Sequence, residues 1–278
     1  MKITLDGKVA LITGGGAGIG RAIAEAFADL GAAVAIAENN TQHAGSVEEY
    51  FRDRGQDALV SRTDVRDAGQ VDACMSAIAG RFGKLDVLVN NVGDFLRPGR
   101  FEDHTEEDWD RLYDINLKQV FRVTKAALPL LRRSSGDRSI ISVSSIEGYR
   151  GMPFCPVYAT FKAGLIGFAK SLALDLGPEG IRVNVIAPET TDSEQVKIDA
   201  LISPQYREHI PRWIPLGRFG LPSDCAGCAV FLATDLSAWV TGTTVHVDGG
   251  ALAAAGFYRT PKGRWTNAPV VVDSGFPV

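Results

Sequence analysis

The sequence predicts an α/β protein in which a doubly wound parallel sheet of about seven strands carries helices on both faces. Three observations support this fold. Of the 278 residues, 45% are hydrophobic and 22% are charged, so the chain can bury a full core. Short runs rich in β-branched residues alternate with longer stretches of helical period. The short runs are apolar throughout, as in parallel strands that helices cover on both sides.

The first two apolar runs enclose a strand–helix–strand unit. Between them, Ile19, Ile23 and Phe27 fall on one face of a helix. The alternation continues along the chain without a linker or an internal repeat, so we expect one domain over residues 1–250 and an extension over residues 251–278. The expected strands span residues 8–13, 33–37, 59–63, 87–90, 139–144, 182–187 and 244–247.

The charge balance and the cysteines argue against several classes of protein. Lys and Arg number 29 against 33 Asp and Glu, a net charge of −4, so no basic surface indicates nucleic acid or an anionic membrane as a partner. No apolar stretch approaches the roughly 20 residues of a membrane span. The 4 cysteines are too scattered for a disulfide framework, which favours the cytoplasm. Cys225 and Cys228 are expected to be a buried structural pair in a helix, and no metal site is expected.

A glycine-rich loop directly follows the first expected strand. The chain has 30 glycines, and several of them cluster between Thr13 and the first expected helix. At a strand-to-helix turn, glycines permit a tight reversal and let backbone amides approach a pyrophosphate at the positive end of the helix dipole. We therefore expect a dinucleotide at this turn, bound by Gly14, Gly16, Gly18, Ile19 and Gly20.

An acidic residue follows the second expected strand and bears on the choice of dinucleotide. Glu38 lies about 20 residues after the glycine loop, the separation expected for an acid that accepts the ribose hydroxyls. Its charge would repel a 2′-phosphate, and neither Asn39 nor Asn40 supplies a cation to hold one. NAD is therefore the expected cofactor, in preference to NADP.

A tyrosine and a lysine share one face of a later helix. Tyr158 and Lys162 are four residues apart, a pair that alone indicates only a surface helix. Ser145, however, lies just after the fifth expected strand, and the carboxyl ends of parallel strands are where such sheets bind ligands. The three side chains are expected to form one site.

With these features the chain resembles the short-chain dehydrogenase/reductase family over nearly all of residues 8–250. The resemblance implies a single-domain Rossmann fold and cofactor contacts from the matched motifs. These motifs are the glycine loop at Thr13 to Gly20, the Asp-Val adenine contact at Asp64 and Val65, Asn90 to Gly93 (including Asn91), the helix asparagine Asn116, Ser145, Tyr158 with Lys162, the loop at Asn184 to Pro188, and Val247 to Gly250.

The expected chemistry is oxidation of a secondary alcohol or reduction of its ketone. Oxidation needs a base for the hydroxyl proton, and Tyr158 is expected to be this general acid/base. A free phenol titrates near 10, so work at neutral pH requires stabilising the phenolate by roughly 4 kcal/mol, which Lys162 and the oxidised nicotinamide, both cationic, would supply. Ser145 should hydrogen-bond the substrate oxygen. By resemblance, Asn116 holds a water that links Lys162 to solvent.

The loop after the sixth expected strand departs from the family pattern. Where the family usually has Gly, this chain has Glu189, so the loop either has a different shape or does not need positive-φ geometry. Our hypothesis is that Thr190, Thr191 or Ser193 binds the cofactor carboxamide. Residues 189–215 occupy the place of the family's substrate lid, and an ordered pair of surface helices is the alternative.

Aromatic residues near the expected catalytic set suggest an apolar, or cyclic, alcohol or ketone as substrate, although such residues also fill cores. The extension, residues 251–278, is too apolar for a solvated end. The resemblance implies a homotetramer (or dimer), and we expect the extension to cross a subunit interface and help close a pocket. The candidate substrate contacts are Phe95, Glu147, Phe154, Cys155 and Trp213, with an exposed role as the alternative for Glu147.

Three functions are compatible with these residues. The first is an NAD-dependent oxidoreductase that interconverts a hydrophobic secondary alcohol and its ketone. The second is an NADPH-dependent 3-oxoacyl-[acyl-carrier-protein] reductase, which Glu38 opposes because of its charge. The third is a non-catalytic dinucleotide-binding protein, which the intact set of Asn116, Ser145, Tyr158 and Lys162 opposes.

Overall fold

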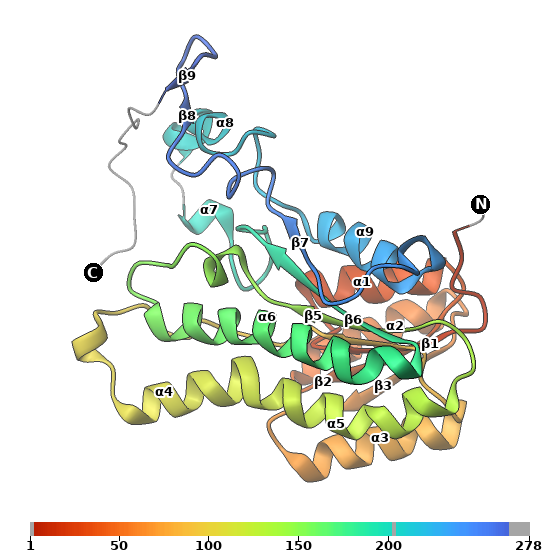
Figure 1. The fold of residues 1–278 in the computed structure, drawn as a ribbon. Helices are drawn as coiled ribbons and strands as arrows, with labels where there is room; N and C mark the ends of the chain where they lie inside the picture. The colour runs from red at the N-terminus through yellow and green to blue at the C-terminus, as the bar shows by residue number, and fades with distance from the viewer. Residues whose placement is uncertain (1–2, 202–203, 267–278) are drawn as a thin grey trace.

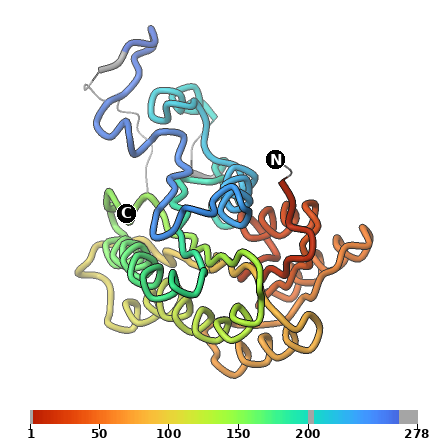
Figure 2. Tube along the Cα trace, turned by 45° about the vertical axis from the view of Figure 1, so that its right-hand side comes forward, coloured from red at the N-terminus to blue at the C-terminus, as the bar shows by residue number. Residues whose placement is uncertain are grey.

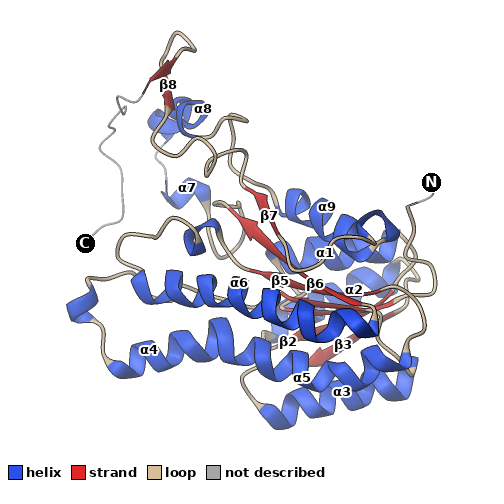
Figure 3. Cartoon of the chain, viewed as in Figure 1, coloured by secondary structure: helices blue, strands red, loops and turns tan. Residues whose placement is uncertain are grey.

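The computed structural model describes residues 3–201 and 204–266, in which strands and helices alternate (Figure 1). Figure 3 shows one layer of strands between layers of helices. The seven strands of the sheet begin and end within one residue of the expected bounds, which confirms the predicted fold. They are β1 (Val9–Thr13), β2 (Ala33–Glu38), β3 (Ala58–Arg62), β4 (Val87–Asn90), β5 (Arg138–Val143), β6 (Ile181–Pro188) and β7 (Thr244–Val247).

All neighbouring strands of this sheet are parallel, in the order β3-β2-β1-β4-β5-β6-β7. The order reverses direction between β1 and β4, because the chain first adds strands on one side of β1 and then on the other. In open α/β sheets a crevice for ligands forms at this switch point, outside the carboxyl ends of the strands.

The two faces of the sheet bury separate hydrophobic clusters. Successive residues of a strand point to opposite faces, so Leu11 joins one cluster and Ile12 the other. Both side chains are fully buried. One face is covered by α1 (Gly18–Asp29), α2 (Thr41–Asp53) and α9 (Pro222–Ala233), and the other by α3 (Ala68–Phe82), α5 (Gln119–Arg133) and α6 (Pro156–Leu176).

Polar residues fix where the helices that frame the crevice begin. The Asn40 side chain accepts hydrogen bonds from the backbone N–H groups of Gln42 and His43 at the start of α2. α4 (Glu106–Tyr113) begins with a capping box between Thr105 and Asp108. It continues through a π-helical turn (Asp114–Lys118) directly into α5.

The segments after β6 and after β7 lie together beyond the carboxyl ends of the strands (Figure 2). The segment expected to be a lid contains two short helices, α7 (Ile198–Leu201) and α8 (Ile210–Trp213). The extension contains a short antiparallel pair, β8 (Tyr258–Arg259) and β9 (Trp265–Thr266), that the sequence pattern did not predict. The rest of the extension, residues 267–278, lies outside the described residues.

No helix in the described part of the chain has both the length and the apolar character needed to cross a membrane.

Candidate active site

The structure brings the expected cofactor and catalytic residues to one edge of the sheet. The glycine loop follows β1, Glu38 ends β2, and Asp64 follows β3. The Asn-Asn motif spans the end of β4, and Ser145 follows β5. The carboxyl ends of these parallel strands therefore form one continuous rim, as the sequence predicted.

The glycine loop is shaped for close approach of backbone to backbone. A Cβ at Gly20 would lie 2.2 Å from the carbonyl oxygen of Gly14, so no other residue fits there without moving the loop. Ile19 lies between them in the first turn of α1 and packs partly against the core. The first turn of α1 has no side-chain cap, so its backbone N–H groups stay available to an anion. The loop therefore fits a pyrophosphate.

Glu38 lies directly against this loop. Its carboxylate accepts hydrogen bonds from the backbone N–H groups of Gly16 (3.1 Å) and Asn40 (2.9 Å), and only 6% of the residue is exposed. A Cβ at Gly16 would meet this carboxylate at 2.8 Å. The negative charge thus occupies the place next to the loop where the ribose of a bound dinucleotide would lie.

The residues expected around the adenine and the central part of the cofactor are held by hydrogen bonds. Asp64 forms an ion pair with Arg66 at 2.7 Å, and this hydrogen bond lowers the pKa of the Asp64 carboxyl. Val65 is buried beside it. The Asn91 side chain donates to the carbonyl oxygens of Thr13 and Gly14, which ties the end of β4 to the glycine loop.

Tyr158 and Ser145 form the centre of the candidate catalytic set. The Ser145 side chain interacts with the Tyr158 phenol and opposes the rise of its pKa. The Ser145 Oγ also accepts the backbone N–H of Glu147 at 3.2 Å, so its own hydrogen is left for an acceptor such as the phenol oxygen or a substrate carbonyl. Phe95 packs edge to face against the Tyr158 ring, with centroids 6.2 Å apart.

Lys162 lies one turn of α6 after Tyr158 and is only 3% exposed. Its Nζ donates to the carbonyl oxygen of Val143 at 3.0 Å and lies 5.6 Å from the centroid of the Tyr158 ring. The Ser144 hydroxyl donates to the backbone carbonyl of Lys162, which ties the helix to the end of β5. The ammonium is thus fixed beneath the phenol.

Burial governs the protonation of this pair. Loss of solvation lowers the pKa of Lys162 to about 8, and the nearby Asp94 partly opposes that effect. Burial also raises the pKa of Tyr158, a change that its hydrogen bond with Ser145 opposes and the charges of Glu147 and Asp94 reinforce. Tyr158 is therefore a neutral phenol at pH 7 in the protein without cofactor.

Asn116 is completely buried in the π-helical turn and binds the loop after β4. Its Oδ1 accepts the Asp94 N–H at 3.0 Å, and its Nδ2 donates to the carbonyl oxygens of Asp94 and Leu112. A Cβ at Gly93 would lie 2.7 Å from Lys162 Nζ and 3.0 Å from Asn116 Oδ1. Both groups thus approach the same point, which only a glycine at position 93 leaves open.

Glu189, which stands where the family usually has a glycine, lies in the loop after β6 without left-handed backbone geometry. Leu96 and Phe154 are the non-glycine residues with positive φ in the described chain, so Glu189 does not need that geometry. The Glu189 carboxylate accepts a hydrogen bond from Thr190 Oγ1 at 2.9 Å, and Thr191 Oγ1 donates to the Glu189 carbonyl oxygen. Pro188 ends β6 immediately before this turn.

The first residues of the expected lid lie across the cofactor rim. The Gln195 amide donates to the Gly93 carbonyl oxygen at 3.3 Å. A carboxylate oxygen of Glu194 lies 2.8 Å from Nε2 of His43 in α2. A Cβ at Gly18 would lie 3.4 Å from the Cβ of Ser193. The segment thus contacts both the glycine loop and the loop after β4.

The candidate substrate residues divide into two groups. Phe95 packs on the Tyr158 ring, and the charge of Glu147 raises the pKa of Tyr158. Cys155 is buried at the start of the same helix, and burial raises the pKa of its thiol to about 11. Phe154 instead accepts the Gly99 N–H through its backbone, and Trp213 lines a separate cavity of about 230 Å³.

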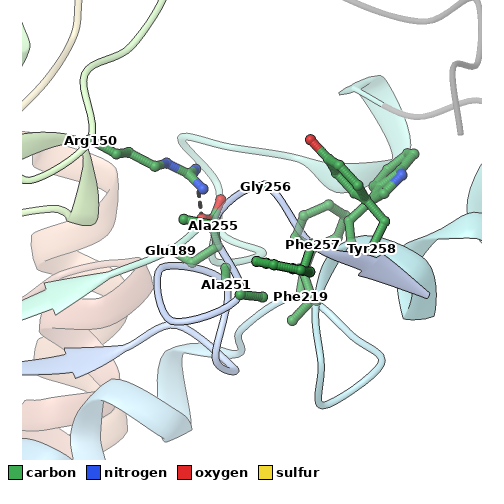
Figure 4. A pocket seen from close by; sticks show the side chains of 11 residues that line it. Arg150, Glu189, Phe219, Ala251, Ala255, Gly256, Phe257 and Tyr258 are labelled. Carbon is green, nitrogen blue, oxygen red and sulfur yellow. Dashed lines mark hydrogen bonds and ion pairs between the residues drawn. The ribbon is translucent and has the colours of Figure 1, made fainter. Parts of the chain in front are cut away.

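This cavity also involves a residue that sequence reasoning missed, Arg150. Figure 4 shows Arg150 paired with Glu189 at one end and aromatic side chains of the lid and the extension at the other. Arg150 lies three residues after Glu147, and opposite charges at this spacing are the signal that could have drawn attention to it.

Comparisons with known proteins find relatives that match most of the chain. A protein-family model described as Enoyl-(Acyl carrier protein) reductase matches residues 14–251. A curated relative, the 3-oxoacyl-[acyl-carrier-protein] reductase FabG of Staphylococcus aureus (strain Mu50 / ATCC 700699), is 40% identical over 252 residues, which cover 90% of this chain and 99% of the relative.

Two solved structures are similar over most of their length. One is a 7α-hydroxysteroid dehydrogenase complexed with NADH and 7-oxo glycochenodeoxycholic acid, with a TM-score of 0.82, 32% identity, and coverage of 89% of this chain and 95% of that chain. The other is a 3-ketoacyl-(acyl-carrier-protein) reductase from Brucella melitensis complexed with NADH, with a TM-score of 0.80, 32% identity, and coverage of 89% and 99%.

Proposed function

The chain belongs to the short-chain dehydrogenase/reductase family of oxidoreductases that act on CH–OH groups, and from this premise we propose that it reduces a ketone to a secondary alcohol, reversibly, with NAD(H). The observation that carries the reaction is the set formed by Ser145, Tyr158 and the buried Lys162 at the carboxyl end of β5. The observation that carries the choice of cofactor is the Glu38 carboxylate against that loop.

Two substrate classes have support. A 3-oxoacyl thioester is the first candidate, because several curated relatives that are 34% to 40% identical across nearly their whole length are 3-oxoacyl-[acyl-carrier-protein] reductases. These relatives favour this class over the hydrophobic secondary alcohol that the sequence suggested. A compact cyclic ketone is the second candidate, favoured by the aromatic cavity that Trp213, Phe219 and Phe257 line next to the site.

The dinucleotide would be held by the chain's own rim residues. We propose that the amides of the glycine loop bind its pyrophosphate, Glu38 its adenosine ribose, and Asp64 with Val65 its adenine. Lys162 and Tyr158 would bind the nicotinamide ribose, and Thr190 or Thr191 the carboxamide. When bound, the nicotinamide supplies or takes the hydride.

The protein's own groups then move the proton. In reduction, Ser145 donates a hydrogen bond to the ketone oxygen and the Tyr158 phenol donates its proton to that oxygen as it becomes an alcohol. The Lys162 ammonium below the phenol stabilises the phenolate that remains. Both hydrogens of the Asn116 amide nitrogen are already donated to backbone carbonyl oxygens, so Oδ1 is the atom that can accept a hydrogen bond from a water near Lys162. That water would return a proton to the site.

A rate panel tests this proposal. Acetoacetyl-CoA, as a soluble 3-oxoacyl thioester, and a series of substituted cyclohexanones are each assayed with NADH and with NADPH. The proposal expects turnover with NADH, and the ratio of kcat/KM for the two ketone classes identifies the substrate. No turnover of either class, or a clear preference for NADPH, contradicts it.

The protonation states predict the pH dependence of ketone reduction. Because burial lowers the pKa of Lys162 to about 8, the ammonium dominates at neutral pH and is lost as the pH rises through that value. The phenol stays protonated over this range because burial raises the pKa of Tyr158. We therefore expect kcat/KM for reduction to be level up to about pH 8 and to fall above it. A profile measured from about pH 6 to pH 10 that stays level throughout contradicts this assignment.

Truncating the extension tests its role. We propose that residues 251–278 belong to the substrate site and to a subunit interface, because Ala254, Phe257 and Tyr258 wall the cavity. Removal of residues 256–278 is expected to raise KM for the ketone about tenfold or more, because the aromatic wall of the cavity is lost. It should also lower the number of subunits in the oligomer. A chain that ends at residue 266 keeps Phe257 and Tyr258 and serves as the control for KM. If the chain that lacks residues 256–278 keeps both its KM for the ketone and its number of subunits, the proposal is contradicted.

A further inference from the structure

An arginine between two carboxylates lies near the catalytic serine in sequence and lines the aromatic cavity. Arg150 donates to Glu147 through Nε (3.2 Å) and Nη2 (2.8 Å), and through Nη2 to Glu189 at 2.7 Å. Glu147 is two residues after Ser145, and Glu189 directly follows β6. We call Glu147, Arg150 and Glu189 the arginine clamp.

The clamp is well fixed at its carboxylate side. The Glu189 side chain is 9% exposed and the Glu147 side chain 16% exposed, whereas that of Arg150 is 39% exposed. Glu189 is also held by Thr190, and the backbone N–H of Glu147 donates to Ser145 Oγ. The position of the guanidinium is therefore linked to the catalytic serine through Glu147.

Apolar and aromatic residues make up most of the described lining of this cavity, and Arg150 and Glu189 are its two charged residues. Its volume of about 230 Å³ exceeds the roughly 150 Å³ that accommodates benzene in a protein core, so it holds a ring or a branched chain. In Figure 4 Arg150 and Glu189 lie at one end of the cavity, and Phe219, Phe257 and Tyr258 lie opposite them.

The charges and open donors of the clamp define which ligand group fits. Two carboxylates against one guanidinium leave one net negative charge at this end of the cavity. Among the described hydrogen bonds none uses Nη1 of Arg150, so this amino group can donate to a ligand. A neutral acceptor gains that hydrogen bond, while an anionic group also meets the excess negative charge.

We propose that the arginine clamp is the specificity determinant of the substrate site: the cavity receives a neutral apolar substituent that carries a hydrogen-bond acceptor, and the clamp rejects the corresponding carboxylate. The inference rests on the proposed function, because it takes the cavity as the place for the part of the ketone away from the reacting carbonyl. It applies to an acyl chain and to a ring alike.

A matched pair of unreactive probes tests the clamp separately from catalysis. Binding of methyl cyclohexanecarboxylate and of cyclohexanecarboxylate to the NADH-loaded protein is measured by ligand-observed NMR. In the wild type the ester is expected to bind at least tenfold more tightly than the acid. Glu189→Gln removes one negative charge with little change of shape, so it should strengthen binding of the acid about tenfold and leave the ester within about threefold.

Two further variants separate the hydrogen bond from the charge. Glu147→Gln should also strengthen binding of the acid, without touching the cavity lining. Arg150→Met should lower the affinity for the ester about tenfold, because the Nη1 donor is lost. The affinity for the acid should stay low. Glu179→Gln, in the exposed Arg132–Glu179 pair outside this cavity, is the matched control and should change neither affinity.

The outcomes are distinct. Equal binding of ester and acid in the wild type, unchanged ratios in the Glu189 and Glu147 variants, or no binding of either probe overturns the clamp proposal. Thermal melting of each variant confirms that the fold is retained. Reduction of ketones with NADH is measured in parallel: activity without charge discrimination overturns only the clamp, and charge discrimination without activity overturns only the proposed function.

Discussion

Replacing Tyr158 with phenylalanine should lower kcat for ketone reduction by roughly 10² to 10⁴, the usual contribution of a positioned general acid. The substitution removes one oxygen from a ring that stays packed against Phe95, so the site should keep its shape. The affinity for NADH should fall by less than about tenfold, because only the hydrogen bond between the phenol and the nicotinamide ribose is lost while the glycine loop and Glu38 keep their contacts. The measurement is the steady-state rate with NADH, alongside the dissociation constant of NADH from protein fluorescence.

Tyr149→Phe is the matched control for this result. Tyr149 lies between Ser145 and Tyr158 in the sequence, is 45% exposed and packs edge to face on His246. Loss of its hydroxyl should therefore leave kcat unchanged. If Tyr158→Phe retains more than about a tenth of the wild-type kcat, the proton comes from another group, and the role given to Tyr158 is wrong.

The second large effect is expected at Glu38. In Glu38→Ala, kcat/KM with NADH should fall about tenfold or more, because the ribose loses a charged acceptor. With NADPH it should rise about tenfold, because the repulsion of a 2′-phosphate disappears and the N–H groups of Gly16 and Asn40 become free to bind it. The ratio of the two values should therefore change by about a hundredfold in favour of NADPH.

An exposed acid on the helix that follows β2 controls for the general effect of losing one negative charge. Glu48 is exposed on α2, and Glu48→Ala should leave the NADH to NADPH ratio within about twofold. A wild-type enzyme that already uses NADPH better than NADH, or a Glu38→Ala variant with an unchanged ratio, would falsify the role given to this carboxylate.

The strands could be predicted because each is defined by its own residues. A run such as Val9-Ala10-Leu11-Ile12 is apolar on both faces, and only a covered parallel strand buries it fully. The expected site followed from the same pattern, since parallel strands place their carboxyl ends together. Gly93 follows β4, and hydrogen bonds tie Lys162 of α6 to the end of the neighbouring strand β5, so these two residues meet although they are distant in sequence.

The arginine clamp could not be predicted in this way. Glu147 and Glu189 follow different strands, and their approach depends on the pairing of β5 with β6 and on the shape of two loops. The replacement of glycine by Glu189 was visible in the sequence, but its partner was not. The π-helical turn that holds Asn116 was also hidden, because its residues continue an ordinary helical pattern and their partner Asp94 comes from another loop.

The short pair β8 and β9 shows the same limit. Two strands of two residues each contain too few positions for an alternation to be recognised. The position of the start of the extension depends on packing between residues that are distant in sequence. Phe257 and Tyr258 line the same cavity as Trp213 and Phe219.

The most direct test of the account is the mass of the alcohol formed from a ketone and NADH in which both hydrogens at nicotinamide C4 are replaced by deuterium. The wild type is expected to yield alcohol with one deuterium on the carbinol carbon, at a rate that exceeds the rate with the matching NADPH by at least tenfold. Tyr158→Phe should yield less than about a hundredth as much in the same time. Alcohol without deuterium, equal yields from the two cofactors, or equal yields from the wild type and Tyr158→Phe would contradict the account.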